Sequence, residues 1–384
     1  MLRILTAGES HGPACLAIVE GLPAGIGITV ADIDKELKRR HADFGRGGRK
    51  LIEKDQAEIL SGIRYGKTLG SPVALMVKNA DFANWREVMG IEATDKPAPP
   101  LTTPRPGHAD LAGALKYGQT DIRNILERAS ARETICRVMA AAVVRKMLAR
   151  FDIAIASHTV QIGAVKMERS DYSFDEVAGV FDNDPDIRCI DAATARRMKQ
   201  AIEAAAAKND TLGGVVEIIA CGVPPGLGSF MHYDRRLDGK IAQGLMSIPS
   251  VKAVAIGNAL QGAAMPGSAF HDPIGYKNDN FRRPTNNTGG IEGGVSNGED
   301  IVCRVYHKPI ATLGKPLDTV DLVTHQPARA TVERSDVCAV PRAGVIAEAM
   351  LALVLGEAML EKFGGDNIRE MKRNYDAYIK ETSQ

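Results

Sequence analysis

Short apolar runs bounded by glycine, proline or asparagine alternate along the chain with longer stretches whose apolar residues recur at helical spacing. The short runs predict β-strands, and the longer stretches, several of them rich in alanine, predict helices. The predicted strands cover 2–6, 14–20, 72–78, 153–164, 214–221, 252–257 and 300–307, and the predicted helices cover 31–40, 133–150, 191–208, 235–247 and 344–363. Their interleaving indicates an α/β or α+β fold.

One sequence pattern occurs twice. AIVEGLPAGIG at 17–27 returns as IIACGVPPGLG at 218–228, and a charged helical stretch follows each copy. A strand, a turn and a helix used twice would suit a duplicated core with pseudo-twofold symmetry, although a match this short also arises by chance. We therefore treat 1–384 as one domain with two related halves, roughly 1–210 and 211–384.

Two segments are too long and too rich in proline, glycine and asparagine to be passive connections. The first is 79–112, with five prolines between 97 and 106, and the second is 263–298. Loops of this length in a compact protein are usually functional or disordered, and the placement of His108 and the glycines favours two lids.

Composition narrows the class of protein. The 48 Lys and Arg residues nearly balance 47 Asp and Glu, so no global field attracts nucleic acid or an anionic membrane. No stretch resembles a signal peptide or 18 uninterrupted apolar residues, and the six cysteines form no CxxC pair, so we expect a reduced, soluble, cytoplasmic protein. Neither a P-loop nor a strand-borne GxGxxG supports a kinase or a dehydrogenase.

The segment ERASARET, 127–134, predicts the mouth of an apolar helix, because Ser130 and Glu133 match a capping box. Free N–H groups at such a mouth favour an anion, and Arg128 and Arg132 add two fork-shaped donors. An ordinary capped helix with solvated arginines is the alternative interpretation.

A second cationic cluster, KRRHADFGRGGRK at 38–50, carries Arg39, Arg40, Arg46 and Arg49 among three glycines. Glycines let the backbone approach a ligand that the arginines bind. An RNA-binding patch or a solvated loop would look similar, but RNA is disfavoured because only Phe44 supplies an aromatic ring and the whole chain is almost neutral.

Two histidines lie between small residues, His11 in GESHGP and His108 in RPGHAD. Such loops can present an imidazole to a pocket as a general acid, and a turn histidine that bonds the backbone is the alternative. No HxH or HExxH spacing indicates a metal, so we expect none. Asp336, shortly before the last predicted helix, fits either a helix cap or a proton relay, and the sequence favours the cap.

Taken together, GESHGPACLAIVEGLP (8–23), RPGHAD (105–110), ERASARET, GGIEGGVSNG (289–298) and RSDVCAVPRA (334–343) resemble, in order, the signature segments of the chorismate synthase family. The resemblance implies an α/β (α+β) sandwich with helices between antiparallel sheets, assembled as a homotetramer. It also implies 1,4-anti elimination of phosphate from 5-enolpyruvylshikimate 3-phosphate, with reduced FMN as cofactor.

The resemblance implies roles for individual residues. His11 would protonate the leaving phosphate side, His108 would protonate reduced flavin near N1, and Asp336 would act with flavin N5 in removing the substrate proton. The implied substrate site comprises Arg40, Arg46, Arg49, Arg105, Ser130, Arg132 and Arg334. The implied flavin site comprises Arg128, Ala129, Ser130, Pro249, Ser250, Gly293, Lys308, Pro309, Ile310, Ala311, Thr312 and Arg334.

Two departures from the family pattern stand out. Pro249 and Ser250 replace an Asn-Ala pair that is usual in relatives, and this puts a side-chain amide contact to flavin in doubt. Cys15 replaces an aliphatic residue. Because no nucleotide fingerprint is present, NADPH is expected only as an external reductant. A phosphotransferase or phosphatase acting on a phosphorylated carboxylic acid is the competing enzyme class, and it would not retain flavin.

Overall fold

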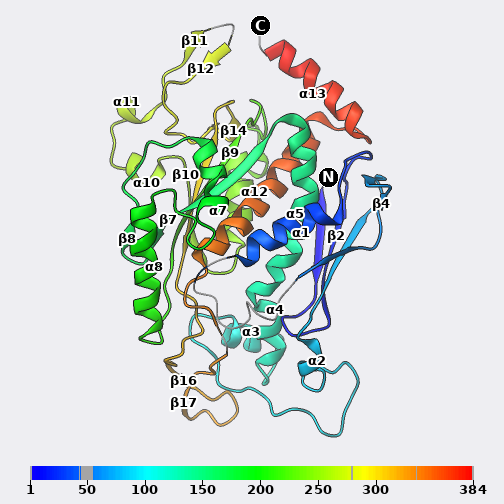
Figure 1. Ribbon diagram of the computed structural model, residues 1–384, viewed down its shortest axis with the longest axis vertical. Helices are drawn as coiled ribbons and strands as arrows, with labels where there is room; N and C mark the ends of the chain where they lie inside the picture. Colours follow the sequence, from blue (N-terminus) through cyan, green and yellow to red (C-terminus); the bar gives the residue numbers. More distant parts are fainter. Residues whose placement is uncertain (1, 43, 45–54, 278–279, 334, 383–384) are drawn as a thin grey trace.

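The fold is described by a computed structural model that covers residues 2–42, 44, 55–277, 280–333 and 335–382 (Figure 1). Two antiparallel sheets carry most of the strands. The first has the order β1 (Arg3–Ala7), β2 (Ala14–Glu20), β6 (Val73–Lys78), β3 (Ala57–Ile59). The second has the order β10 (Val251–Ile256), β15 (Ile301–His307), β9 (Gly214–Cys221), β7 (Ala154–Ile162), β8 (Val165–Lys166).

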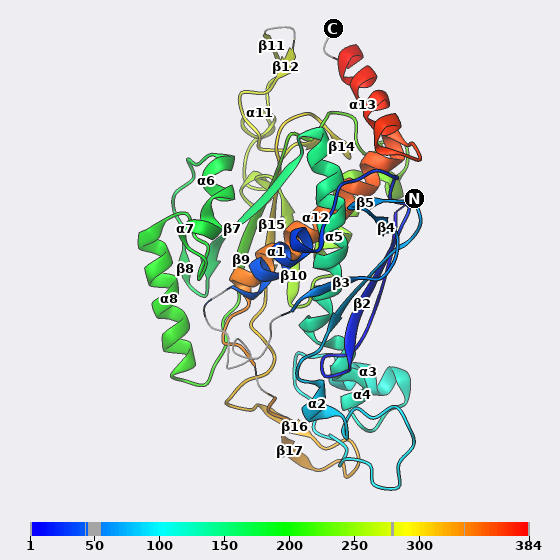
Figure 2. The same ribbon diagram turned by 45° about the vertical axis from the view of Figure 1, so that its right-hand side comes forward.

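Helices fill the space between the two sheets, as Figure 2 shows. These are α1 (Val30–His41), α5 (Thr134–Leu148) and α12 (Val340–Phe363), and α9 (Leu237–Met246) packs on α12 and β10. Alternation in the strands explains the packing: Cys15, Ala17 and Val19 of β2 are buried, whereas Ile18 between them is exposed. The predicted sandwich with helices between antiparallel sheets is confirmed.

Further helices cover the outer side of the second sheet and one end of the molecule. α6 (Phe174–Ala178), α7 (Val180–Asn183) and α8 (Ala192–Ala206) lie outside β7 and β8, and α13 (Ile368–Thr382) follows α12 (Figures 1 and 2). The sequence patterns predicted α8 but missed α13. The remaining short elements are β4 (Ile63–Arg64), β5 (Lys67–Thr68), α10 (Ala259–Gly262), α11 (Gly267–Phe270), β11 (Gly275–Lys277), β12 (Asn280–Arg282), β13 (Ile291–Glu292) and β14 (Val295–Ser296).

α12 is the central helix of the core. Within the described part of the chain it alone is long and apolar enough to cross a membrane, but 83% of its most apolar window is buried inside the fold. Its Glu348 is 1% exposed and bonds Arg39 of α1 at 2.8 Å and Arg145 of α5 at 3.0 Å. These pairs tie three inner helices together, because a buried carboxylate is tolerated only with partners.

The two sheets repeat one connection pattern. In the first, two strands (β1, β2), a helix (α1), two strands (β3, β6) and a helix (α5) follow one another, and the sheet order is first-second-fourth-third. The series β7, β9, α9, β10, β15, α12 repeats this order if β8, the helices α6 to α8 between β7 and β9, and the shorter elements within both series are set aside. The second series begins at residue 154, well before 211. Duplication stays a prediction, and we now draw its boundary between α5 and β7.

Long connections gather beyond one end of the sandwich, at the bottom of Figure 1. They contain α2 (Phe82–Trp85), α3 (Asp110–Tyr117), α4 (Arg123–Ala129), β16 (Asp318–Val320) and β17 (Pro327–Arg329). Backbone bonds knit two of them, from Leu322 N–H to Thr102 O at 2.9 Å and from Thr331 N–H to Thr103 O at 3.1 Å. This layer closes one side of the cavity described next.

Candidate active site

A cavity of about 530 Å³ lies at the N-terminal ends of α5 and α12 and is lined by their first turns. Such a volume suits a small molecule or a cofactor. Segments far apart in sequence reach it. Of the predicted site residues, those that line it are His11, Arg40, Arg105, His108, Ala129, Ser130, Arg132, Pro249, Ser250, Lys308, Ile310, Ala311, Thr312 and Asp336.

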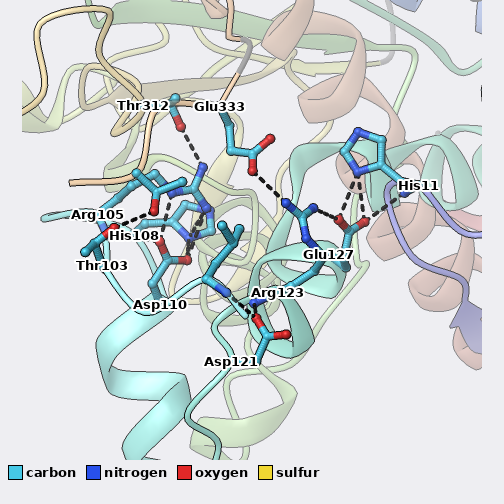
Figure 3. A network of polar contacts seen from close by, with 12 residues as sticks. His11, Thr103, Arg105, His108, Asp110, Asp121, Arg123, Glu127, Thr312 and Glu333 are labelled. Atoms are coloured by element: carbon cyan, nitrogen blue, oxygen red, sulfur yellow. Dashed lines mark hydrogen bonds and ion pairs between the residues drawn. The ribbon is translucent and has the colours of Figure 1, made fainter. Parts of the chain in front are cut away.

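His11 is fixed by a carboxylate and an aromatic ring. Its Nδ1 lies 2.9 Å from Oε1 of Glu127, and its backbone N–H donates to Oε2 at 2.8 Å (Figure 3). Its ring stacks on Trp85 with centroids 3.8 Å apart. The preceding loop needs Gly8, whose φ is +111° and where a Cβ would lie 2.3 Å from Ala14 O.

His108 belongs to a second buried cluster. Its Nδ1 lies 2.5 Å from Oδ1 of Asp110, which also accepts from Arg105 Nε at 2.8 Å through Oδ2 (Figure 3). Arg105 Nη1 donates to Thr312 Oγ1 at 2.7 Å, and this joins the cluster to the opposite loop. Most N–H donors of the Arg105 guanidinium are therefore bonded to other side chains of the protein.

The mouth of α5 carries two buried arginines. Arg132 Nη2 lies 3.0 Å from Asp55 Oδ1, and Arg40 donates to Thr134 Oγ1 and Ala131 O at 3.0 and 3.1 Å. Burial opposes ionisation of Asp55, but the bond from His41 and the charge of Arg132 hold the pKa of Asp55 well below its usual range. The described residues therefore bring two guanidinium groups and the ionised carboxylate of Asp55 together at this mouth.

The predicted capping box is wrong in detail. Ser130 Oγ accepts from Arg132 N–H at 3.3 Å and caps a short 3₁₀ turn, Ala131–Glu133, that precedes α5. The carboxylate of Glu133 pairs with Arg137 at 2.6 Å instead of reaching back to the cap. Glu133 thus ends the 3₁₀ turn, and its carboxylate is used by Arg137 of α5.

Asp336 does not cap α12, the helix that it precedes. α12 has Ala339 at its N-cap position without a side-chain bond, and Asp336 pairs with Arg342 beside the cavity. The cap interpretation is therefore wrong, and the proton-relay role of Asp336 stays a prediction.

Lys308 and Ser250 line the cavity, and Ser250 contacts the imidazole of His307, which lies outside the lining. Burial and then nearby Lys252 lower the pKa of Lys308, for which the described residues supply no carboxylate partner. Ser250 has a φ of +76°, and its hydroxyl lies 2.9 Å from His307 Nδ1. Burial lowers the pKa of His307 to about 4, so its ring is neutral near pH 7.

Some predicted residues lie elsewhere. Arg128 points away from the cavity and donates to Gly8 O and Thr6 O at 3.0 Å. Gly293, on the β13–β14 turn, and Pro309 are not part of the lining either. Arg46, Arg49 and Arg334 lie outside the described residues. Of the two predicted lids, 79–112 lines the cavity, whereas no described residue of 263–298 does.

Several lining or supporting residues escaped the sequence analysis, namely Asp81, Trp85, Asp110, Glu127, Glu333 and Arg342. Asp110 and Glu127 fall inside the motifs RPGHAD and ERASARET, so their position was available as a signal. Across the described ranges, no group of three or more His, Cys, Asp or Glu side chains is arranged to hold a metal ion.

Comparison with known proteins agrees over the whole chain. The chorismate synthase family model matches residues 2–360. The chorismate synthase of Moorella thermoacetica is 54% identical over 379 residues, with 98% of each chain covered, and that of Solibacter usitatus is 49% identical over 386 residues, with 99% of each covered. A crystal structure of chorismate synthase matches with a TM-score of 0.80 and 40% identity, over 100% of this chain and 98% of the other. These matches give no support to a phosphatase or phosphotransferase, and the chain belongs to the chorismate synthase family.

Proposed function

We propose that the cavity binds 5-enolpyruvylshikimate 3-phosphate and reduced FMN and eliminates phosphate to form chorismate, a carbon–oxygen lyase reaction. The observation that carries the proposal is the meeting of two carboxylate-held imidazoles, four arginines and one lysine in a single cavity. A substrate with a phosphate and two carboxylates needs such convergent cations in a chain whose net charge is only +1.

The lining fits a flavin. Apolar residues such as Leu126, Ile248, Ile310 and Ile346 provide a wall for a planar ring, and Lys308 provides a cation for a phosphate or ring oxygen. We assign the flavin to Ala129, Ser130, Pro249, Ser250 and the segment 308–312. When bound, the reduced flavin would supply the electron density that a redox-neutral elimination needs to break an unactivated C–H bond.

Arg40 and Arg132 at the mouth of α5 are the proposed anion ligands, with Arg105 across the cavity. The dipole of α5 adds to their field, because its N-terminus opens at the same place. Arg46, Arg49 and Arg334 complete the proposed substrate site. These fixed charges would hold the substrate and stabilise charge on the departing phosphate.

Proton transfers are assigned to three residues. With a second proton on Nε2, His11 would give that proton on the phosphate side and His108 would give it on the flavin side, and each ring would return to the neutral form with its proton on Nδ1. Asp336 would accept the substrate proton, and its pair with Arg342 would keep it ionised until then.

Assembly as a homotetramer is also proposed. The outer face of the first sheet exposes Leu5 (62%) and Ile18 (41%), and such uncovered apolar residues suit burial against another copy. The protein would work in the cytoplasm, with NADPH acting only through an external flavin reductant.

The decisive experiment is anaerobic incubation of 5-enolpyruvylshikimate 3-phosphate and FMN with and without dithionite, followed by the ultraviolet absorbance of chorismate. We expect product only when flavin is reduced. Phosphate release without flavin would reject the proposal in favour of a phosphatase.

A further inference from the structure

Two buried carboxylates stand behind the two active-site histidines. Glu127 of α4 has a side chain 2% exposed, and Asp110 at the start of α3 is fully buried. Neither residue is among the cavity-lining groups, so neither is placed to touch a ligand. Each contacts its histidine through the same ring atom, Nδ1.

Glu127 holds His11 at two points. Its Oε1 and Oε2 lie 2.9 and 3.0 Å from Nδ1, and Oε2 accepts the backbone N–H of His11 at 2.8 Å. Arg123 Nη1 donates to Oε1 at 2.9 Å, and Arg123 Nη2 reaches Glu333 at 3.0 Å (Figure 3). Both carboxylate oxygens therefore face N–H donors.

Asp110 repeats this arrangement around His108. Oδ1 lies 2.5 Å from Nδ1, while Oδ2 accepts the backbone N–H of Arg105 at 3.0 Å and its Nε at 2.8 Å. In both clusters one carboxylate thus binds an imidazole, a nearby backbone N–H and an arginine. The same arrangement therefore occurs twice, once with a carboxylate of α4 and once with the first residue of α3.

The protonation of both carboxylates follows from their partners. Burial pushes the pKa of Glu127 up, but bonds from His11 and Arg123 hold it below its usual value. The pKa of Asp110 is held well below its usual range in the same way, against burial, by His108 and Arg105. An ionised carboxylate only accepts, so Nδ1 of His11 carries a proton. Nδ1 of His108 also lies 3.0 Å from Arg105 Nη2, but its contact with Asp110 Oδ1 is shorter, at 2.5 Å, and two acceptors this close need a proton between them.

We infer that Glu127 and Asp110 are positioning residues that fix His11 and His108 as Nδ1–H tautomers, so that proton transfer takes place at Nε2. The inference rests on the proposed function for the reaction that Nε2 serves, but not for the tautomer itself. A carboxylate on one ring nitrogen is a general means of orienting the other.

The direct test is ¹⁵N NMR of histidine-labelled protein without ligands, because ¹⁵N shifts distinguish Nδ1–H from Nε2–H imidazole. Loss of one signal in His11→Asn assigns His11. We expect the Nδ1–H form in the wild type and the Nε2–H form of His11 in Glu127→Gln, because an amide NH₂ must then face one of the former donors. Asp110→Asn should do the same to His108.

Controls separate positioning from packing. Glu133→Gln removes a carboxylate that pairs with Arg137 rather than His11, and it should leave both tautomers unchanged. Glu127→Asp keeps the charge and should restore the Nδ1–H tautomer of His11. An unchanged tautomer in Glu127→Gln, or the same change in Glu127→Asp as in Glu127→Gln, would overturn the inference.

Activity supplies the second readout. We expect kcat to fall at least about tenfold in Glu127→Gln and in Asp110→Asn, with flavin affinity kept. A wild type that forms no chorismate would refute the proposed function while the tautomer result still stood. An active wild type whose kcat survives both substitutions would refute the positioning role. If either Glu127→Gln or Asp110→Asn fails to fold, the other variant tests the inference through the same two measurements, the histidine tautomer and kcat.

Discussion

The imidazole of His11 lies nearly parallel to the indole of Trp85, with ring centroids 3.8 Å apart and planes inclined at 24°. The guanidinium of Arg123 lies 5.1 Å from the same indole, so Trp85 is held between two polar partners. Because Trp85 is the only tryptophan in the chain, the tryptophan fluorescence of the protein reports on this site alone.

Replacing Trp85 should therefore weaken catalysis by loosening His11. Stacked aromatic pairs contribute about 0.5–1.5 kcal/mol beyond their buried area, so Trp85→Ala should lower kcat/KM roughly 2- to 10-fold. Trp85→Phe keeps a ring and should retain most of the activity. Equal kinetics in Trp85→Ala and the wild type would show that the stack has no catalytic consequence.

His11→Ala should lower turnover on the order of 10²- to 10⁴-fold, because a general acid contributes about that much. Flavin affinity should stay largely intact, since the proposed flavin ligands lie on other segments. Steady-state kinetics and anaerobic flavin titration measure the two effects separately. Full activity in this variant would remove the acid role.

Arg132→Ala should act mainly on substrate binding. A charge-assisted bond contributes about 1.5–3 kcal/mol, so KM should rise roughly 10- to 100-fold with a smaller change in kcat. Arg137→Ala is the matched control, because Arg137 lies in the first turns of α5, pairs with Glu133 and lies outside the cavity lining. An unchanged KM in Arg132→Ala would argue against an anion site at the mouth of α5.

Asp336→Asn should slow the chemical step with the fold intact, since the side chain pairs with Arg342 and does not cap α12. Single-turnover rates and a thermal melt test the two parts. Loss of folded protein with normal rates in the surviving fraction would return Asp336 to a purely structural role.

His307 should make stability depend on pH in mildly acid solution. Its pKa falls from 6.5 to about 4 on burial, so the unfolded chain binds the proton first and stability is complete only above pH 6.5. The free energy of unfolding should drop by on the order of 2 kcal/mol between pH 7 and pH 5. Urea titrations at both values should show a smaller drop in His307→Gln, with exposed His232→Gln as control. A drop of wild-type size in His307→Gln would place the effect elsewhere.

The seven main strands and five main helices were predictable because their alternation is local. β2 coincides with its predicted range, and α12 begins only four residues earlier than predicted, with Pro341 in its first turn. α13 was missed because most of its residues are polar, although Ile368, Met371, Tyr375 and Tyr378 recur at helical spacing and pack on the core.

Residues of the site were predictable only where they belong to a recognisable sequence motif. Glu127 lies 116 residues from His11 in the sequence, and no local sequence pattern predicts that their side chains are in contact. Arg128 shows the opposite failure: it stands two residues before Ser130, yet α4 turns it toward the carbonyls of Thr6 and Gly8. The direction of a side chain depends on which helix face meets the core, and a motif does not encode that.

Glu348 has a consequence for the synthesis of the chain. The apolar stretch of α12 is long enough to be inserted into a bilayer as it leaves the ribosome, before the sheets that cover it have closed. A carboxylate within such a stretch makes insertion less favourable by roughly 2.5–3.5 kcal/mol near its centre. The residue that anchors Arg39 and Arg145 in the folded protein therefore also lowers the tendency of this stretch to enter a bilayer before the sheets cover it.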